Sequence, residues 1–250
     1  MKHHVHRYFV PDSLQNYNHL VVAGDKAASI DPFNWDLALA EAERLGVTLT
    51  EIWLTHGHGD HVAGVPKHFA GPVRGHPDTA SRVNLTDPLT GGEKLAFNGC
   101  PVEVLATPGH TFDHLCFFLP RIPALIAGDT LFNAGVGNTR SGDTDTLFCS
   151  IQALRQLPGD THLYNGHDYM PTNVRFTESI IGETATTQAW AEACTTTDES
   201  TRPVTTLAQE AELNLFLRTD DANLIKALEL PDDAPEQQVF RKLRERRDQW

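Results

Sequence analysis

The feature that most constrains this chain is a cluster of potential metal ligands in residues 55–61, which read Thr-His-Gly-His-Gly-Asp-His. The candidate ligands are His56, His58, Asp60 and His61. The apolar run just before them predicts a strand that carries this loop to the end of a sheet. Glycines between the ligands allow tight turns, so that successive side chains can converge. Imidazole nitrogen together with carboxylate oxygen suits zinc, iron or manganese.

Three further candidates follow apolar runs downstream. His110 comes after the predicted strand Val102–Thr107, Asp129 ends another apolar run, and His167 follows the predicted strand His162–Asn165. Each alone could be a capping carboxylate or a histidine bonded to loop backbone. Together they repeat one pattern, a strand followed by a small residue and then a ligand. Seven ligands fit two metal ions that share one carboxylate, which is a known arrangement for hydrolysis.

The remaining pattern predicts an α+β fold. Short predicted strands, rich in branched or aromatic residues and ending near Gly, Pro or Asp, fill the first 130 residues: His19–Gly24, Ala27–Asp31, Glu51–Thr55, Val102–Thr107, Leu115–Leu119 and Ala124–Gly128. Between them, Trp35–Leu45 predicts an amphipathic helix that ends at Gly46. A second helix is expected after the histidine cluster, and a third over Thr146–Leu157. Short strands with interspersed helices favour a layered domain over a regular βαβ winding.

The last third of the chain changes character. Its predicted elements are helices: Ala185–Cys194, Leu207–Leu217, Asp220–Leu230 and Pro235–Gln249. We therefore expect a metal-binding catalytic domain over residues 1–170 and a mainly helical region over residues 171–250, to which the family resemblance described below assigns substrate binding.

Charge and hydropathy exclude several classes of partner. The 250 residues carry a net charge of −13, which argues against binding to nucleic acid or to an anionic membrane surface. No apolar run approaches the length needed to span a bilayer, and the first 14 residues lack the apolar core of a signal peptide, which favours a cytoplasmic location. The four cysteines form no CxxC pair and are expected to be reduced, mostly buried thiols. His3, His4 and His6 are expected in a mobile N-terminus rather than a metal site.

The order of the motifs THGHGDH, TPGHT, AGDTLF and NGHDY resembles the metallo-β-lactamase superfamily and, within it, glyoxalase II, the hydroxyacylglutathione hydrolases. The resemblance extends through nearly the whole chain, including its helical C-terminal part. It implies a four-layer αββα sandwich of two facing sheets, with metal ions at one edge, followed by a C-terminal helical region.

The resemblance also implies a ligand set for two divalent metal ions, zinc above all, with iron or manganese as alternatives. One ion would be held by His56, His58 and His110, and the other by Asp60, His61 and His167. Asp129 would bridge both ions, and Asp60 and Asp129 are the expected catalytic carboxylates.

The implied reaction is hydrolysis of S-D-lactoylglutathione to D-lactate and glutathione, by attack of a metal-bound hydroxide on the thioester carbonyl. A thiolate leaves easily, so no strong general acid is required. No serine or cysteine of the chain lies in a triad-like motif. The expected partner is thus a small glutathione thioester, bound by a monomer or small homo-oligomer.

Glutathione carries two carboxylates, so its site should offer cationic groups. The segment Arg241–Asp248 is basic in an otherwise acidic protein, although a solvated basic helix face would look the same. By resemblance, Arg244 and Arg247 would grip the glycine carboxylate of glutathione, and Tyr169 would contact its backbone.

Several positions depart from the family pattern. In the loop Gly135–Gly142, Asn138 replaces a basic residue and Arg140 a tyrosine, and Arg140 is a candidate to restore the lost charge. Asn214–Arg218 lacks a proline, which is expected to change a local helix start, and Asp113 replaces a glycine. These departures bear on glutathione binding more than on metal-dependent hydrolysis.

Other functions remain open at this point. Within the fold, they are a lactonase or β-lactamase-like hydrolase and a persulfide dioxygenase with one iron held by two histidines and an aspartate. His58 argues against flavodiiron proteins, which carry glutamate there, and the acidity argues against nucleases. Outside catalysis, the chain could be a metal-binding or partner-binding protein that kept the site after losing activity.

Overall fold

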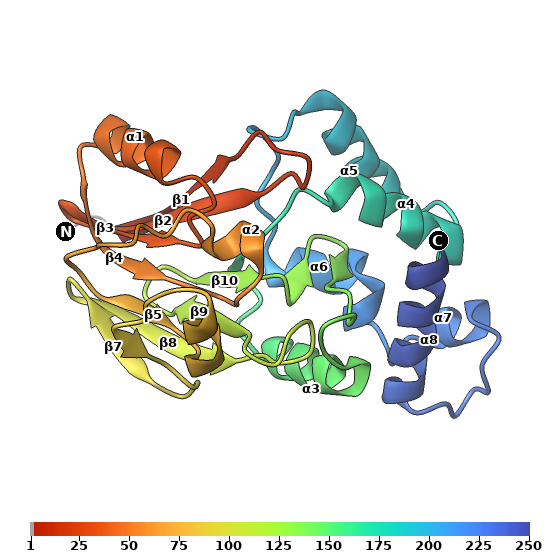
Figure 1. The fold of residues 1–250 in the computed structure, drawn as a ribbon. Helices are drawn as coiled ribbons and strands as arrows, with labels where there is room; N and C mark the ends of the chain where they lie inside the picture. Colours follow the sequence, from red (N-terminus) through yellow and green to blue (C-terminus); the bar gives the residue numbers. More distant parts are fainter. Residues whose placement is uncertain (1–2) are drawn as a thin grey trace. The chain divides into compact units, whose positions relative to one another are not determined.

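The computed structural model describes residues 3–250, which divide into two compact units. The first unit contains the chain up to Thr107 together with Asp113–Gly128 and Tyr164–His167. The second contains Pro108–Phe112, Asp129–Leu163 and Asp168–Trp250. Figure 1 follows the chain from the red N-terminal strands to the dark-blue C-terminal helix.

A six-stranded sheet begins the first unit. Its strands, in spatial order, are β1 (His3–Phe9), β2 (Tyr17–Ala23), β3 (Lys26–Ile30), β4 (Thr48–Trp53), β5 (Val73–Gly75) and β6 (Asp87–Pro88). Strand β2 is antiparallel to both of its neighbours, β1 and β3, whereas β3 to β6 run parallel. The carboxyl ends of β4 and β5 therefore meet at one edge of the sheet.

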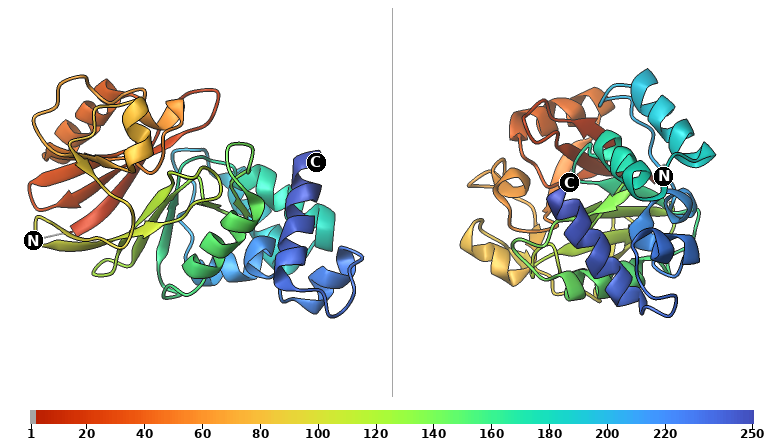
Figure 2. Two further views of the ribbon diagram at one scale, coloured as in Figure 1. Left: turned by 60° about the horizontal axis from the view of Figure 1, so that its bottom comes forward. Right: turned by 90° about the vertical axis from the view of Figure 1, so that its right-hand side faces the viewer.

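A five-stranded sheet forms a second layer. Its strands, in spatial order, are β13 (His162–Asn165), β10 (Ala124–Gly128), β9 (Leu115–Leu119), β8 (Cys100–Ala106) and β7 (Lys94–Phe97). Side chains from both sheets, among them Val21, Trp53 and Phe117, form one buried core. The predicted bounds of β9, β10 and β13 agree with the structure, and the left view of Figure 2 shows the red-orange and yellow-green strands as two layers.

Helix α1 (Trp35–Leu45) covers the outer face of the first sheet. Its buried residues Ala38 and Ala42 belong to a hydrophobic cluster with side chains of β2. The Asn34 side chain caps its N-terminus by accepting a hydrogen bond from the Leu37 N–H. Gly46 ends the helix with φ 67°, a left-handed conformation that favours glycine. The predicted helix is confirmed at both ends.

The expectation of a mobile N-terminus is wrong for residues 3–9. These residues form β1, which pairs with β2 from His3↔Ala23 to Phe9↔Tyr17. His6 Nε2 also lies 2.8 Å from Glu41 Oε2 of α1. The sequence does not indicate a strand here because residues 3–9 contain three histidines and an arginine and only one β-branched residue, Val5.

The second unit is mainly helical (Figures 1 and 2). It contains the short strands β11 (Leu131–Phe132) and β12 (Gly135–Val136). Its helices are α3 (Thr144–Leu154), α4 (Met170–Ile181), α5 (Ala185–Thr196), α6 (Leu207–Leu213), α7 (Ala222–Ala227) and α8 (Glu236–Gln249). Among residues 3–250, no helix is long and apolar enough to cross a bilayer.

The single helix predicted over Leu207–Leu217 is wrong. Helix α6 ends at Leu213, and a separate 3-10 helix covers Leu215–Leu217. Asn214 lies between them with ψ 109°, which is not helical, and its side chain accepts a hydrogen bond from the Phe216 N–H. The asparagine thus competes with the helical backbone and interrupts the helix.

Candidate metal centre and substrate cavity

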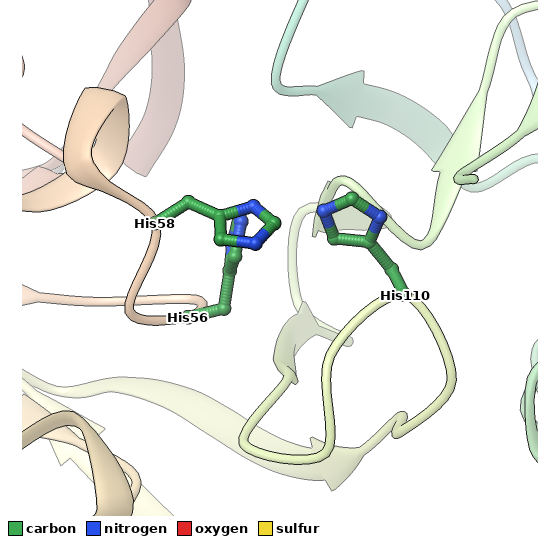
Figure 3. Close-up of side chains that lie close together, drawn as sticks. All are labelled: His56, His58 and His110. Atoms are coloured by element: carbon green, nitrogen blue, oxygen red, sulfur yellow. The ribbon is translucent and has the colours of Figure 1, made fainter. Parts of the chain in front are cut away.

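Four predicted ligands of the first unit come from the loop and short helix after β4. His56 and His58 lie on the loop, and Figure 3 shows both side chains projecting from it. Their ring centroids are 4.7 Å apart. Helix α2 (Gly59–Val62) then carries Asp60 and His61, and the His61 ring lies 4.1 Å from that of His56. The loop therefore brings three imidazoles together at the end of one strand.

His167, which follows β13, joins this group. Asp60 Oδ2 lies 3.4 Å from Nε2 of His61 and 3.4 Å from Nε2 of His167. One ligand atom from each of the three residues lies within 4.8 Å of the other two. The structure thus brings together residues more than 100 positions apart in the chain, as the pattern of strand ends predicted.

The Nδ1 atoms of His61 and His167, on the side of each ring away from Asp60, contact other groups of the protein. His61 Nδ1 lies 2.9 Å from Asp31 Oδ2, and His167 Nδ1 donates to the Leu14 carbonyl over 2.9 Å. The Asn16 amide donates to Asp60 Oδ2 over 3.1 Å. Such contacts fix the tautomer and direct Nε2 into the cluster, as in metal-binding histidines.

His56 is oriented by two neighbours. Its ring stacks on the buried His114 at 5.0 Å between centroids and 24° between planes. Its Nδ1 lies 3.0 Å from Thr55 Oγ1, which donates to Asp31 Oδ2 over 2.6 Å. Asp31 and His114 are not among the site residues predicted from the sequence. The only local signals are a carboxylate that ends a predicted strand and a second histidine four residues after His110.

The two other predicted ligands belong to the second unit. His110, labelled in Figure 3, and Asp129 are both buried, and His110 Nε2 lies 3.6 Å from Asp129 Oδ2. His110 Nδ1 lies 2.7 Å from the Asn138 carbonyl oxygen. A Cβ atom at Gly137 would lie 2.1 Å from the Asp129 carbonyl, so only glycine fits there. The seven predicted ligands thus form two groups, five residues in the first unit and two in the second.

The donor set of both groups fits divalent transition metals. Imidazole nitrogens and carboxylate oxygens are the ligands of zinc, iron and manganese sites. The Nδ1 contacts to a carboxylate or carbonyl oxygen are those expected of metal-ligating histidines. The chain therefore carries a divalent-metal site of histidine and aspartate residues.

A cavity of about 300 Å³ lies within the second unit. All four predicted substrate-binding residues line it, and so does Asp129; the set is Asp129, Arg140, Tyr169, Arg244 and Arg247. The cavity therefore combines three guanidinium groups with one predicted metal ligand.

The two arginines of α8 that line the cavity, Arg244 and Arg247, differ in what they contact. Arg244 is 5% exposed, and its Nη1 donates to the carbonyls of Val136 and Gly137 over 3.2 Å each. Its Nη2 lies 2.9 Å from Asp248 Oδ1. Most of its donors are thus used within the protein, and burial lowers the pKa of its guanidinium.

Arg247 is only half-buried. Its carbon Cζ lies 5.3 Å from the Trp250 ring centroid and 5.7 Å from that of Phe176, within cation–π range. Its Nη2 reaches Asn173 Oδ1 at 3.4 Å. Arg247 thus keeps more donors available to a ligand than Arg244 does.

A buried carboxylate holds the turn between β11 and β12. Glu210 of α6 is fully buried and accepts hydrogen bonds from the Ala134 N–H, the Thr205 hydroxyl and the Asn133 amide at 2.7–3.1 Å. Burial raises the pKa of its carboxyl, although these hydrogen bonds act in the opposite direction. The Asn214 amide adds hydrogen bonds to carbonyls of the same turn. This network fixes the segment that leads into the cavity wall.

Replacing Glu210 by glutamine is expected to destabilise the protein by about 1–3 kcal/mol. Both carboxylate oxygens face donors, so an amide nitrogen at either position leaves a buried donor unsatisfied. Urea unfolding measures the change. Glu212→Gln on the exposed side of α6 is the matched control and should change stability by less than about 0.5 kcal/mol. Equal stabilities of the two variants would contradict the role of the network.

Comparison with known proteins identifies the class of this fold and site. Residues 13–167 match the family model of the metallo-beta-lactamase superfamily, and residues 168–250 match that of the hydroxyacylglutathione hydrolase C-terminus. A B3 metallo-beta-lactamase, BLEG-1, has the same fold, with a TM-score of 0.65 and 22% identity over 86% of this chain and 99% of that one. The chain is a member of the metallo-beta-lactamase superfamily, with the α+β fold and C-terminal helical region that the sequence predicted.

Curated relatives narrow the family. Hydroxyacylglutathione hydrolases of Nitrosococcus oceani and of a Polaromonas species are each 36% identical to the chain, over 98% of it and 99% of the relative. ETHE1 from Myxococcus xanthus is similar in structure, with a TM-score of 0.65 and 25% identity over 95% of both chains. Within the superfamily, the chain belongs to the hydroxyacylglutathione hydrolase family.

Proposed function

We propose that this protein is a metal-dependent thioester hydrolase that converts S-D-lactoylglutathione and water into D-lactate and glutathione. The observation that carries the proposal is the arginine-lined cavity of the second unit, which includes Asp129 in its wall. The family of its curated relatives supports the same reaction.

For the metal centre, we propose two divalent ions, with zinc as the expected metal. His56, His58 and His110 would hold one ion, and Asp60, His61 and His167 the other, while Asp129 contributes to both. The contacts that direct Nε2 of His61 and His167 towards Asp60 support the second group. When bound, such ions lower the pKa of water towards neutrality and polarise a carbonyl oxygen.

The residues of the cavity would bind the thiol part of the substrate. Arg247 and Arg140 offer guanidinium donors that match the carboxylates of a glutathione group. Tyr169 would contact the peptide backbone of that group. Arg244 would act largely by holding the Val136 and Gly137 carbonyls in the cavity wall. A thiolate is a good leaving group, so these residues need to bind and orient it rather than protonate it.

The two regions of the chain are expected to have different roles in this reaction. We propose that residues 1–170 carry the catalytic groups and residues 171–250 complete the substrate site, a division near the limits of the two matched family models. The cytoplasmic location and the monomeric or small homo-oligomeric state stay predictions of the sequence.

The test is hydrolysis of S-D-lactoylglutathione by protein of measured metal content. We expect efficient turnover, nearly two metal ions per chain, and loss of activity with a chelator that is restored by zinc. Negligible turnover by fully loaded protein would contradict the proposed substrate. Assays of lactones, β-lactams and persulfides would then distinguish the other reactions of this fold.

A further inference from the structure

Asp113, which departs from the family pattern, lies against the ligand loop of the first unit. Its Oδ2 accepts a hydrogen bond of 2.8 Å from Thr79 Oγ1. A Cβ atom built at Gly57 would lie only 2.9 Å from the same oxygen. The carboxylate therefore packs on the loop backbone between His56 and His58.

The partner of Asp113 is itself well anchored. Thr79 is 1% exposed and belongs to the 3-10 helix Pro77–Ser81, which follows β5. Because β4 and β5 are parallel, this helix and the ligand loop emerge at the same sheet edge. At Gly57, the added Cβ would also lie 3.7 Å from Thr79 Cγ2 and 3.6 Å from Arg82 Cδ. Three side chains thus enclose one side of the loop.

We infer that Asp113 is a positioning residue that fixes the loop carrying His56 and His58 and thereby raises the affinity of the protein for its metal. The inference rests on the proposed function in that these histidines are taken as metal ligands. Glycines 57 and 59 make the loop conformationally free, so a contact that orders it before binding reduces the cost of binding. Loss of a residue that hydrogen-bonds to a metal ligand typically lowers metal affinity 10- to 100-fold, and a residue that orders only the ligand loop is expected at the lower end of this range.

Zinc affinity, measured by competition with a chromophoric chelator, tests this role. Asp113→Gly is expected to bind zinc about 10-fold more weakly. Asp113→Asn keeps an acceptor for Thr79 and should recover most of the affinity, whereas Thr79→Val removes the donor and should weaken binding. Asp25→Gly, the same change at an exposed turn of the same unit, is the matched control and should bind as the wild type does.

A double-mutant cycle tests the contact itself. The Gly57 backbone does not adopt a positive φ, so alanine suits its conformation, and the Cβ clash with Asp113 is the main obstacle. Gly57→Ala should therefore weaken zinc binding in the wild type but have little effect in Asp113→Gly. Circular dichroism of the metal-free variants checks that each is folded.

Each outcome decides between the two proposals. Two zinc ions bound by the wild type with unchanged affinity in Asp113→Gly would overturn the positioning role alone. Additive effects of Gly57→Ala and Asp113→Gly would also overturn it. A wild type that binds no zinc would overturn the proposed metal centre, and the positioning role with it.

Discussion

Asp129→Ala is expected to abolish nearly all thioester hydrolysis, with kcat/KM lower by at least ~1,000-fold, which corresponds to about 4 kcal/mol. The expected reason is loss of the carboxylate proposed to contribute to both metal positions. Asp129 is buried beside His110. A water molecule that fills the space left by its side chain would not replace the negative charge of the carboxylate. Metal content per chain should fall together with activity.

Two further variants define what the Asp129 result means. Asp129→Asn keeps the volume of the side chain, so a similar loss assigns the effect to the charge. Asp143→Ala removes an exposed carboxylate from the same unit, where it caps α3, and should lower stability without loss of metal. Two bound metal ions and full turnover in Asp129→Ala would contradict the bridging role.

The candidate ligands could be predicted from the sequence because each follows an apolar run. His56, His110 and His167 lie within four residues of the ends of β4, β8 and β13. The pattern of apolar residues that predicts a strand is local, and the end of the strand fixes where the next side chains lie. Helix α1 was predictable because its apolar residues group on one side and Gly46 stands just past its C-terminal end. Local sequence patterns were therefore enough to predict those residues whose positions depend only on the helix or strand next to them.

The contacts that orient those ligands could not be predicted. His61 is held by Asp31, and His167 by the backbone carbonyl of Leu14, which any residue type could supply. The pairing of β1 depends on its partner strand β2, and the helix break at Asn214 depends on a side chain that competes for a backbone hydrogen bond. The periodicity of apolar residues indicates neither of these. Such information exists only once the sheets and helices have packed.

Arg247→Ala is expected to raise the KM for S-D-lactoylglutathione about 10-fold or more while changing kcat much less. A half-buried guanidinium that binds a remote carboxylate contributes equally to the substrate complex and the transition state, and its loss therefore appears in KM. Steady-state kinetics at fixed metal content measure the split. Arg246→Ala removes the same charge from an exposed position of α8 and should leave both constants near wild type.

Arg244→Ala should behave differently, although sequence similarity assigns both arginines the same role. Its loss leaves the carbonyls of Val136 and Gly137 without their guanidinium donor. Gly137 packs directly against the Asp129 backbone, so disorder there should reach the proposed metal ligand. We therefore expect lower kcat and lower stability in addition to any rise in KM. A pure KM effect in Arg244→Ala, equal to that of Arg247→Ala, would instead show that both side chains serve only to bind substrate.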